Sequence, residues 1–355
     1  MKTPWELLKE SKTKIKTTWR IAFVSALVLG LWIHLPVMLS DIPNHDGLSS
    51  MYFDQNMITS GRWFLTVACG FSSYFTIPWV IGLIGLIWLA LTAAVLTEVL
   101  ELTDPVTITV VSGLLVSFPA LASTFAYVFT MDGYMQALFL AVLAVLFTAK
   151  YPRGYLAGAV CLAFSMGIYQ AYLPFTILLC VYKILLCFME EKGWKEKAKY
   201  VCRYLGMGIA GGVLYYVILQ ILLKLQGKVL DTYQGINSME QMGSGMGILA
   251  TIKEMYVDFL AFTVHGNVLV NNIFSLAACI ILVATVVFLV IRSMIWRKWW
   301  KNPAFFVIMI LLGISMPLLT NVILLISPNL TYHLLMRYQW VLYLILMTAF
   351  ADRYT

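Results

Sequence analysis

Long uninterrupted apolar runs constrain this chain more than any other feature. Three of them, 77–96, 273–291 and 305–326, are each long enough to cross the hydrocarbon core of a bilayer as a helix, which takes about 20 residues. Only 12% of the residues are charged, whereas soluble domains carry roughly 25%. The runs also lack the alternation over roughly ten residues that marks a membrane β-strand. We therefore expect an all-α, polytopic membrane protein.

The hydropathy pattern predicts about ten transmembrane helices in a single domain, 1–355. A basic segment, 1–19, precedes the first helix, which we interpret as a retained span because no small-residue cleavage site follows it. Two longer loops, 41–76 and 225–272, lie between spans, and the second contains a possible surface helix over 249–264. The predicted spans are 20–40, 77–96, 106–126, 134–149, 154–171, 172–189, 204–224, 273–291, 304–326 and 338–350.

The basic residues indicate how the chain is oriented. When alternate loops are assigned to the two sides, 19 of the 24 Lys and Arg residues fall on one side. Basic loops stay in the cytoplasm, so the N-terminus is expected there and the loop 41–76 outside. The formal charge of +7 then reflects orientation and contact with anionic membrane lipids. Nucleic acid is not expected as a partner.

A polar cluster directly follows the first predicted span, in the stretch DIPNHDGL (41–48). After Asp46, apolar residues recur at helical spacing over 48–62, which predicts a short helix lying in the outer interface. Asp46 is suited to cap that helix, and a carboxylate at the mouth of a membrane cavity is equally suited to act as a general base toward a hydroxyl. The two roles are compatible.

Four further polar residues are candidates at the outer side. Asp132 precedes a predicted span and has the same ambiguity between a helix cap and a site residue. Arg62 is the one basic residue between the first two spans, and it is able to snorkel, pair with an Asp or hold a phosphate. Tyr169 and Gln170 lie near the outer end of the fifth span, where a Gln most often bonds to another helix.

Metal and cofactor binding are not indicated. The six cysteines form no C-x-x-C pair, so neither a zinc site nor a disulfide framework is favoured. A divalent-metal site built from His45 with Asp41 or Asp46 has the right chemistry but lacks a regular ligand spacing. We therefore expect no cofactor.

Four motifs, taken in order, resemble the serotype-converting O-antigen glucosyltransferase (Gtr type II) family of the GT-C glycosyltransferase superfamily. The ordered set carries the resemblance, which covers roughly the first half of the chain; the second half is similar in hydropathy and in its long external loop. Relatives are longer, which implies that a C-terminal portion is absent here. The motifs are NHDGL (44–48), GRWF (61–64), FPALASTFAYVFTMDGYMQAL (118–138) and AFSMGIYQAYLPF (163–175).

The resemblance implies a GT-C-like glycosyltransferase of the bacterial cytoplasmic membrane. Its donor would be a hexose linked to polyprenyl phosphate, with glucose as the first candidate. Its acceptor would be a surface polysaccharide or a lipid-linked glycan. Transfer would invert the anomeric centre on the outer face. GT-C enzymes place an essential acid in the first external loop, which assigns the general base to Asp46 first and Asp41 second. The candidates for donor or acceptor binding are Asn44, His45, Arg62, Asp132, Tyr169 and Gln170.

A lipid-linked sugar flippase or a small-solute transporter is the alternative. Transporters usually carry ionisable groups near the middle of the membrane. The predicted spans are nearly free of such groups at mid-depth, and the acids gather at the outer boundary. This distribution favours the transferase.

Overall fold

The computed structural model describes most of the chain as helix. The described residues are 3, 15–40, 56–70, 72, 77–190, 193–231, 247–266, 268–296, 298, 303–327 and 330–355, and they contain no strand. Asp41, Asn44, His45 and Asp46 lie outside them, as does most of the interfacial helix predicted over 48–62. An all-α fold is thus confirmed for the part of the chain that is described.

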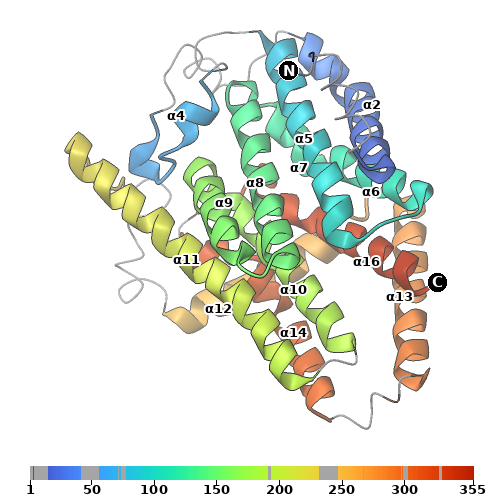
Figure 1. The fold of residues 1–355 in the computed structure, drawn as a ribbon. Coiled ribbons are helices and arrows are strands. Elements are labelled where there is room, and N and C mark those ends of the chain that lie inside the picture. The colour runs from blue at the N-terminus through green and yellow to red at the C-terminus, as the bar shows by residue number, and fades with distance from the viewer. Residues whose placement is uncertain are drawn as a thin grey trace.

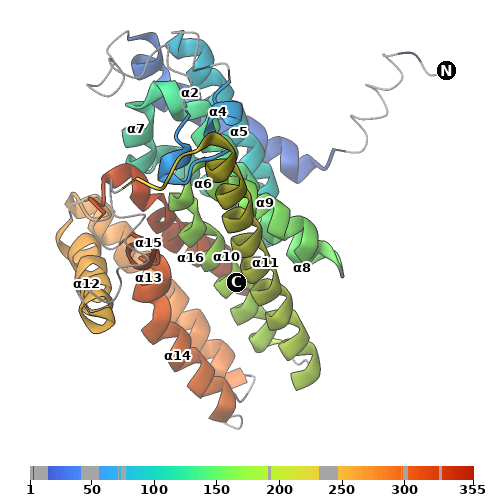
Figure 2. The same ribbon diagram turned by 90° about the vertical axis from the view of Figure 1, so that its left-hand side faces the viewer.

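Two groups of helices form the molecule. In the first, α2, α5, α8, α9 and α11 lie side by side in that order, as Figure 1 shows, and α6 packs against α2. In the second, α10, α13, α14 and α16 pack together, so that the C-terminal helices lie against one face of the first group (Figure 2). The first group comprises α2 (Thr17–Leu39), α5 (Pro78–Leu100), α6 (Pro105–Ser117), α7 (Pro119–Phe125), α8 (Met131–Lys150), α9 (Gly154–Ile168) and α11 (Trp194–Gln226). The second comprises α10 (Leu173–Met189), α12 (Ile248–Leu260), α13 (Ile273–Trp296), α14 (Pro303–Thr320), α15 (Ile323–Ile326) and α16 (Val341–Tyr354). Short helical segments are η1 (Ile58–Ser60), α4 (Leu65–Ala68), η2 (Val128–Thr130), η3 (Gln170–Tyr172), η5 (Ala261–His265) and η7 (Leu334–Trp340).

The apolar helices make this a multi-pass membrane protein. Among the described residues, 7 helices are long and apolar enough to cross a membrane, and an eighth results if the bent pair α6–α7 is one span. The helices α9 and α14 are apolar but shorter. The described helices thus support seven or eight spans, and the count of about ten stays a prediction.

Helix boundaries differ from the predicted spans at several places, and two of these differences have a clear cause in the sequence. The helix α11 begins at Trp194, ten residues before the predicted start, because its first turns (WKEKAKY) are polar but consist of good helix formers. The span predicted over 106–126 breaks at Phe118, where α6 and α7 meet at 49°. Pro119 causes this break, because it has no N–H to donate and its ring disfavours a helical residue before it.

Two side chains from distant parts of the chain satisfy the carbonyls at this break. In a straight helix the carbonyl of Leu115 would accept from residue 119, which is a proline. The hydroxyl of Tyr338, in η7, donates to Leu115 O instead. Nε2 of His34, in α2, lies 2.8 Å from Val116 O and donates to it. The break is thus fixed in place by both helix groups.

Tyr338→Phe is expected to destabilise the protein by about 1–3 kcal/mol, because it leaves a buried carbonyl without a donor. Thermal unfolding of the purified protein in detergent measures the effect. Tyr256→Phe is the matched control: its hydroxyl donates to Ile314 O, within α14, at an exposed position. A loss at Tyr338 no larger than at Tyr256 would contradict the account of the break.

Three helix ends lie close together. The charge pattern predicts that these ends are on the cytoplasmic side. The carboxylate of Glu98, near the end of α5, accepts from Lys16 at the start of α2 at 2.7 Å. The same carboxylate accepts from Lys150 at the end of α8 at 2.8 Å. Three separate segments of the chain therefore meet at one end of the bundle.

A second cluster of charges lies at this end. Glu101 follows α5 in a left-handed backbone conformation (φ 60°), and its carboxylate accepts from Lys183 at 2.6 Å and from Arg353 at 2.8 Å. Burial opposes ionisation of Glu101, but the hydrogen bond and charge of Lys183, with the charge of Arg353, outweigh it and lower its pKa. The cluster ties the ends of α5, α10 and α16 together.

Glu101→Gln is expected to lower the melting temperature at pH 7, with the deficit shrinking as the pH falls below about 4. A carboxyl whose pKa is lower in the folded chain stabilises the fold above its unfolded pKa, about 4.3 for Glu, and this contribution is lost as the pH falls through the folded pKa. Melting curves of both proteins between pH 3 and 8 test this. A deficit that stays constant over the whole range would show that the charge of Glu101 is not responsible.

The helix predicted over 249–264 is observed as α12, which continues into η5. Asp258 on α12 accepts two hydrogen bonds from the guanidinium of Arg337, at 2.7 and 2.6 Å, and a third from Asn321 at 3.1 Å. The guanidinium also lies 3.9 Å from the ring centroid of Tyr332. These contacts hold α12 against the segment that joins α14 to α16.

Candidate active site

The segment that follows the first span is held by the turn between α9 and α10. Nε2 of Gln170 donates to Ser60 O at 3.1 Å, and the hydroxyl of Tyr215 on α11 donates to Gly61 O at 3.0 Å. Gln170 also donates to the Tyr215 hydroxyl at 3.0 Å. The GRWF and GIYQAY stretches, which are far apart in the sequence, are therefore in direct contact.

Gly61 is required for this arrangement for two reasons. Its backbone has a φ of 77°, in the left-handed region that disfavours residues with a Cβ. A Cβ at this position would lie 2.5 Å from Oη of Tyr215 and 2.6 Å from Nε2 of Gln170. The hydrogen bonds that hold the segment therefore occupy the space that any side chain would need.

Gly61→Ala is expected to destabilise the protein by at least about 2 kcal/mol, from the left-handed backbone and the overlap with two fixed side chains. Gly212→Ala on α11 is the control, since nothing lies within 4 Å of its Cβ position. This control should be neutral or stabilising by up to about 1 kcal/mol. The melting temperatures of the two variants measure this difference. Equal values would refute the close approach of Tyr215 and Gln170 to Gly61.

An aromatic cluster supports the same segment. The indole of Trp63 packs edge-on against Phe164, with ring centroids 5.2 Å apart, and covers Gly167, whose Cβ would lie 2.5 Å from the indole. The backbone N–H of Phe64 donates to Gly167 O at 2.7 Å. Ile58 is buried against α11. The segment 58–64 is thus packed against α9, the α9–α10 turn and α11.

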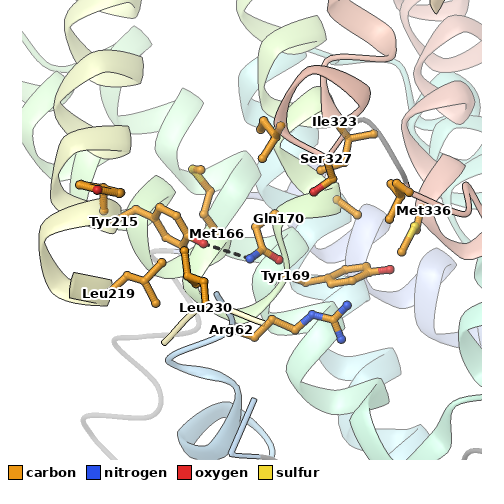
Figure 3. Close-up of a pocket in the computed structure, with 14 residues that line it drawn as sticks. Arg62, Met166, Tyr169, Gln170, Tyr215, Leu219, Leu230, Ile323, Ser327 and Met336 are labelled. Carbon is orange, nitrogen blue, oxygen red and sulfur yellow. Dashed lines mark hydrogen bonds between the residues drawn. The ribbon is translucent and has the colours of Figure 1, made fainter. Parts of the chain in front are cut away.

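Arg62 lies on a pair of stacked tyrosines. Its Nη1 donates to the hydroxyl of Tyr134 on α8 at 3.2 Å, and its guanidinium lies 5.0 Å from the ring centroid of Tyr169. The rings of Tyr134 and Tyr169 are stacked, with centroids 4.1 Å apart. Figure 3 shows the guanidinium beneath the ring of Tyr169. These contacts fix the position of the positive charge.

A cavity of about 90 Å³ brings three of the predicted residues together (Figure 3). It lies between the α9–α10 turn, α11 and the segment 323–336, so both helix groups contribute to its wall. Arg62, Gln170, Tyr215 and Ser327 supply polar groups, and most of the remaining wall is aliphatic. The cavity is lined by Arg62, Met166, Tyr169, Gln170, Ala171, Tyr215, Tyr216, Leu219, Leu230, Ile323, Ile326, Ser327, Leu330 and Met336.

Asp132 is not among the residues that line this cavity. Its side chain is buried, and its Oδ1 accepts from the hydroxyl of Ser72 at 2.7 Å and from the N–H of Gly133 at 2.9 Å. It lies in the first turn of α8, after the capping residue Thr130, where a negative charge is favourable. Asp132 thus anchors Ser72, in the loop 41–76, to α8.

Several residues that line the cavity were not predicted as site residues from the sequence. Tyr215 and Tyr216 lie inside a predicted span, and two consecutive tyrosines in an apolar run were a signal that could have been used. Ser327 and Met336 had no recognisable signal, because they approach the α9–α10 turn only in the folded chain. Within the described ranges, no three His, Cys, Asp or Glu side chains are close enough to share a metal ion. The metal ligands considered for His45 lie outside those ranges.

Comparison with known proteins places these residues in a family. The family model described as "Glucosyl transferase GtrII" matches residues 35–350, whereas no curated protein and no solved structure matches. The match runs from α2 into α16, so it includes the segment 323–336 and extends well beyond the motifs quoted from the first half. This confirms the resemblance drawn from those motifs: the chain belongs to the GtrII glucosyl transferase family.

Proposed function

We propose that this protein transfers a hexose from a polyprenyl-phosphate donor to a surface polysaccharide or lipid-linked glycan. Glucose is the first candidate for the hexose. The reaction takes place on the outer face of the bacterial cytoplasmic membrane. The chain crosses the membrane ten times in a GT-C-like fold, with its N-terminus in the cytoplasm. The observation that carries the proposal is the match to a glucosyl transferase family over 35–350.

The position of the cavity supports transfer on the outer face. Tyr134, which holds Arg62, lies in the first turns of α8, and Lys150, which pairs with Glu98, is its last residue. These positions are roughly 24 Å apart along a helix axis, close to the thickness of the hydrocarbon core. Since the end with Lys150 carries the basic residues, the cavity lies at the opposite, outer end.

The chemistry needs one base and one cationic group. The acceptor hydroxyl oxygen attacks the anomeric carbon, the bond from this carbon to the phosphate oxygen breaks, and the electron pair leaves with the phosphate. A phosphate is a good leaving group, so the main requirements are removal of the acceptor proton and stabilisation of the phosphate charge. We assign removal of the acceptor proton to Asp46, with Asp41 as the second candidate. We assign stabilisation of the phosphate charge to Arg62. Inversion follows from a single displacement.

The remaining candidates have binding roles in this proposal. Asn44 and His45 precede the base directly, and Tyr169 and Gln170 lie in the cavity wall beside Arg62. Asp132 is a weaker candidate, because its described contacts are with Ser72 and Gly133. Surface glycans from cells with and without the gene, compared by mass and linkage analysis, test the proposal. One additional hexose per repeat is expected with the gene, and identical glycans would overturn it.

A transporter is the second candidate function. The ion pairs of Glu98 and Glu101 lie at one end of the helices, and that of Asp258 with Arg337 lies near the other. Transporters instead gather such groups near the midplane. Movement of a lipid-linked sugar across proteoliposomes without any transfer would favour this alternative.

A further inference from the structure

The helix α12 presents apolar side chains on the side that faces away from the rest of the protein. Leu249, Val257 and Leu260 are 82%, 56% and 58% exposed. They point away from Thr251 and Met255, which are the buried residues of this helix. A patch of exposed apolar residues marks a surface that contacts something other than water.

Two hydrogen bonds show how α12 is turned relative to α14. On one flank, Asp258 accepts from Asn321, which directly follows α14, at 3.1 Å. On the other flank, the hydroxyl of Tyr256 donates to Ile314 O at 2.6 Å. Ile314 lies six residues before the end of α14 at Thr320, which is about 9 Å along the helix axis. The flank with Tyr256 therefore faces the apolar body of α14, and the flank with Asp258 faces its end.

The side chains on the two flanks differ in the same sense. The stripe that contains Tyr256 is apolar, because Leu249 and Ile252 precede it and Leu260 follows it at spacings of three and four residues. The opposite stripe is acidic, because the exposed Glu254 lies one turn before the ion-paired carboxylate. An apolar stripe along one flank and charges along the other are typical of a helix that lies in a membrane interface.

The apolar stripe of α12 continues the exposed surface of α14. Ile310 and Ile314 are both exposed on α14, and the carbonyl of Ile314 is the one that Tyr256 reaches. Because α14 is an apolar helix of a membrane protein, its exposed side chains contact lipid. Lys253 is exposed on the outward side of α12, with an apolar stem and an ammonium group suited to the phosphates of lipid head groups.

We propose that α12 is an interfacial helix whose exposed apolar side contacts the lipids of one leaflet. Its apolar stripe lies at the boundary between head groups and acyl chains, about 5–10 Å deep, and its acidic flank faces water. Because Asp258 pairs with Arg337, the lipids around α12 also hold the segment that joins α14 to α16. That this leaflet is the outer one rests on the proposed function; the contact with lipid does not.

Fluorescence quenching tests the contact with lipid without requiring activity. A coumarin amino acid replaces Leu260 in the full chain, and the matched control carries it at Glu254, on the opposite flank of the same helix. A reference variant carries it at Val283, an exposed residue in the middle of α13. A further variant at Leu249 repeats the test in case the replacement of Leu260 prevents folding.

Each purified protein is placed in phosphatidylcholine nanodiscs, which leave both faces of the bilayer open to solvent. One set of nanodiscs contains a lipid with a nitroxide near the head group, and a second set contains a lipid with a nitroxide near the end of the acyl chain. Iodide is the quencher in water. The three quenchers thus report contact with the interface, with the hydrocarbon core and with water.

The shallow nitroxide should quench the fluorophore at Leu260 severalfold more than that at Glu254, and iodide should reverse this order. At Val283 the deep nitroxide should be the most effective quencher. Equal quenching of Leu260 and Glu254 by lipid would overturn the proposal. It would also be overturned if no lipid quenched Leu260, which would point to a second copy of the protein on this side. Stronger quenching of Leu260 by the deep nitroxide would contradict an interfacial position as well.

The same measurements separate this proposal from the proposed function. Quenching of Leu260 by the shallow nitroxide in a protein that transfers no hexose would leave the interfacial helix standing while the proposed function fails. Strong quenching of Leu260 by iodide in an active transferase would have the opposite meaning.

Discussion

Asp46→Asn is expected to abolish hexose transfer while leaving expression and folding intact. Asn caps a helix about as well as Asp, but an amide does not take up the acceptor proton. Loss of a general base typically lowers the rate by 10²–10⁴-fold. The measurement is sugar transfer in membranes supplied with a lipid-linked donor, together with the melting temperature of the purified protein.

Asp41→Asn provides the matched control, because it removes a carboxylate five residues away in the same loop. If Asp46 is the base, this second variant retains most of the activity. The reverse result would move the role to Asp41. Full activity in Asp46→Asn would remove Asp46 from the mechanism altogether, and a mild loss with a lower melting temperature would reduce its role to a helix cap.

Arg62→Met is expected to lower the rate of transfer by on the order of ten- to a hundredfold with little change in melting temperature. The guanidinium is assigned to the donor phosphate, and a hydrogen bond to a charged group is worth about 1.5–3 kcal/mol. Arg62→Lys keeps the charge but not the planar fork, so it should restore part of the activity. Rates at several donor concentrations show whether binding or turnover is affected.

Tyr134→Phe separates the role of Arg62 from that of its support. It removes the hydroxyl that accepts from Arg62 and keeps the stack on Tyr169, so only a small loss of activity is expected. If the melting temperatures of Arg62→Met and Arg62→Lys fall in step with their activities, then Arg62 is a structural residue. The proposed phosphate site would be refuted.

The membrane helices could be predicted from hydropathy because a bilayer demands long apolar segments. The break at Phe118 was not predicted, although Pro119 was visible, because a proline is tolerated in a span when neighbouring groups satisfy the freed carbonyls. Those groups are His34 and Tyr338, and neither lies near the proline in the sequence. The early start of α11 was missed because hydropathy does not register a polar helical extension.

The candidate site was predictable in part. Arg62 was recognised as the one basic residue between the first two spans, and Tyr169 and Gln170 as polar residues near the outer end of the fifth; the folded chain places all three in one cavity wall. Asp132 was recognised as an acid before a predicted span, and in the folded chain it binds Ser72 of the loop 41–76. The contribution of 323–336 could not be foreseen, because it depends on how the second helix group packs against the first. A family match that reaches residue 350 agrees with a site built from both groups.

Transfer by the purified protein tests the central claim most directly. The protein is reconstituted in liposomes and supplied with a polyprenyl-phosphate hexose and a glycan acceptor. The mass of the acceptor is then measured by mass spectrometry. The account predicts that the acceptor gains one hexose with the inverted linkage, and that Asp46→Asn leaves it unchanged. An acceptor that stays unmodified while the lipid-linked sugar crosses the bilayer would contradict a transferase and identify a transporter.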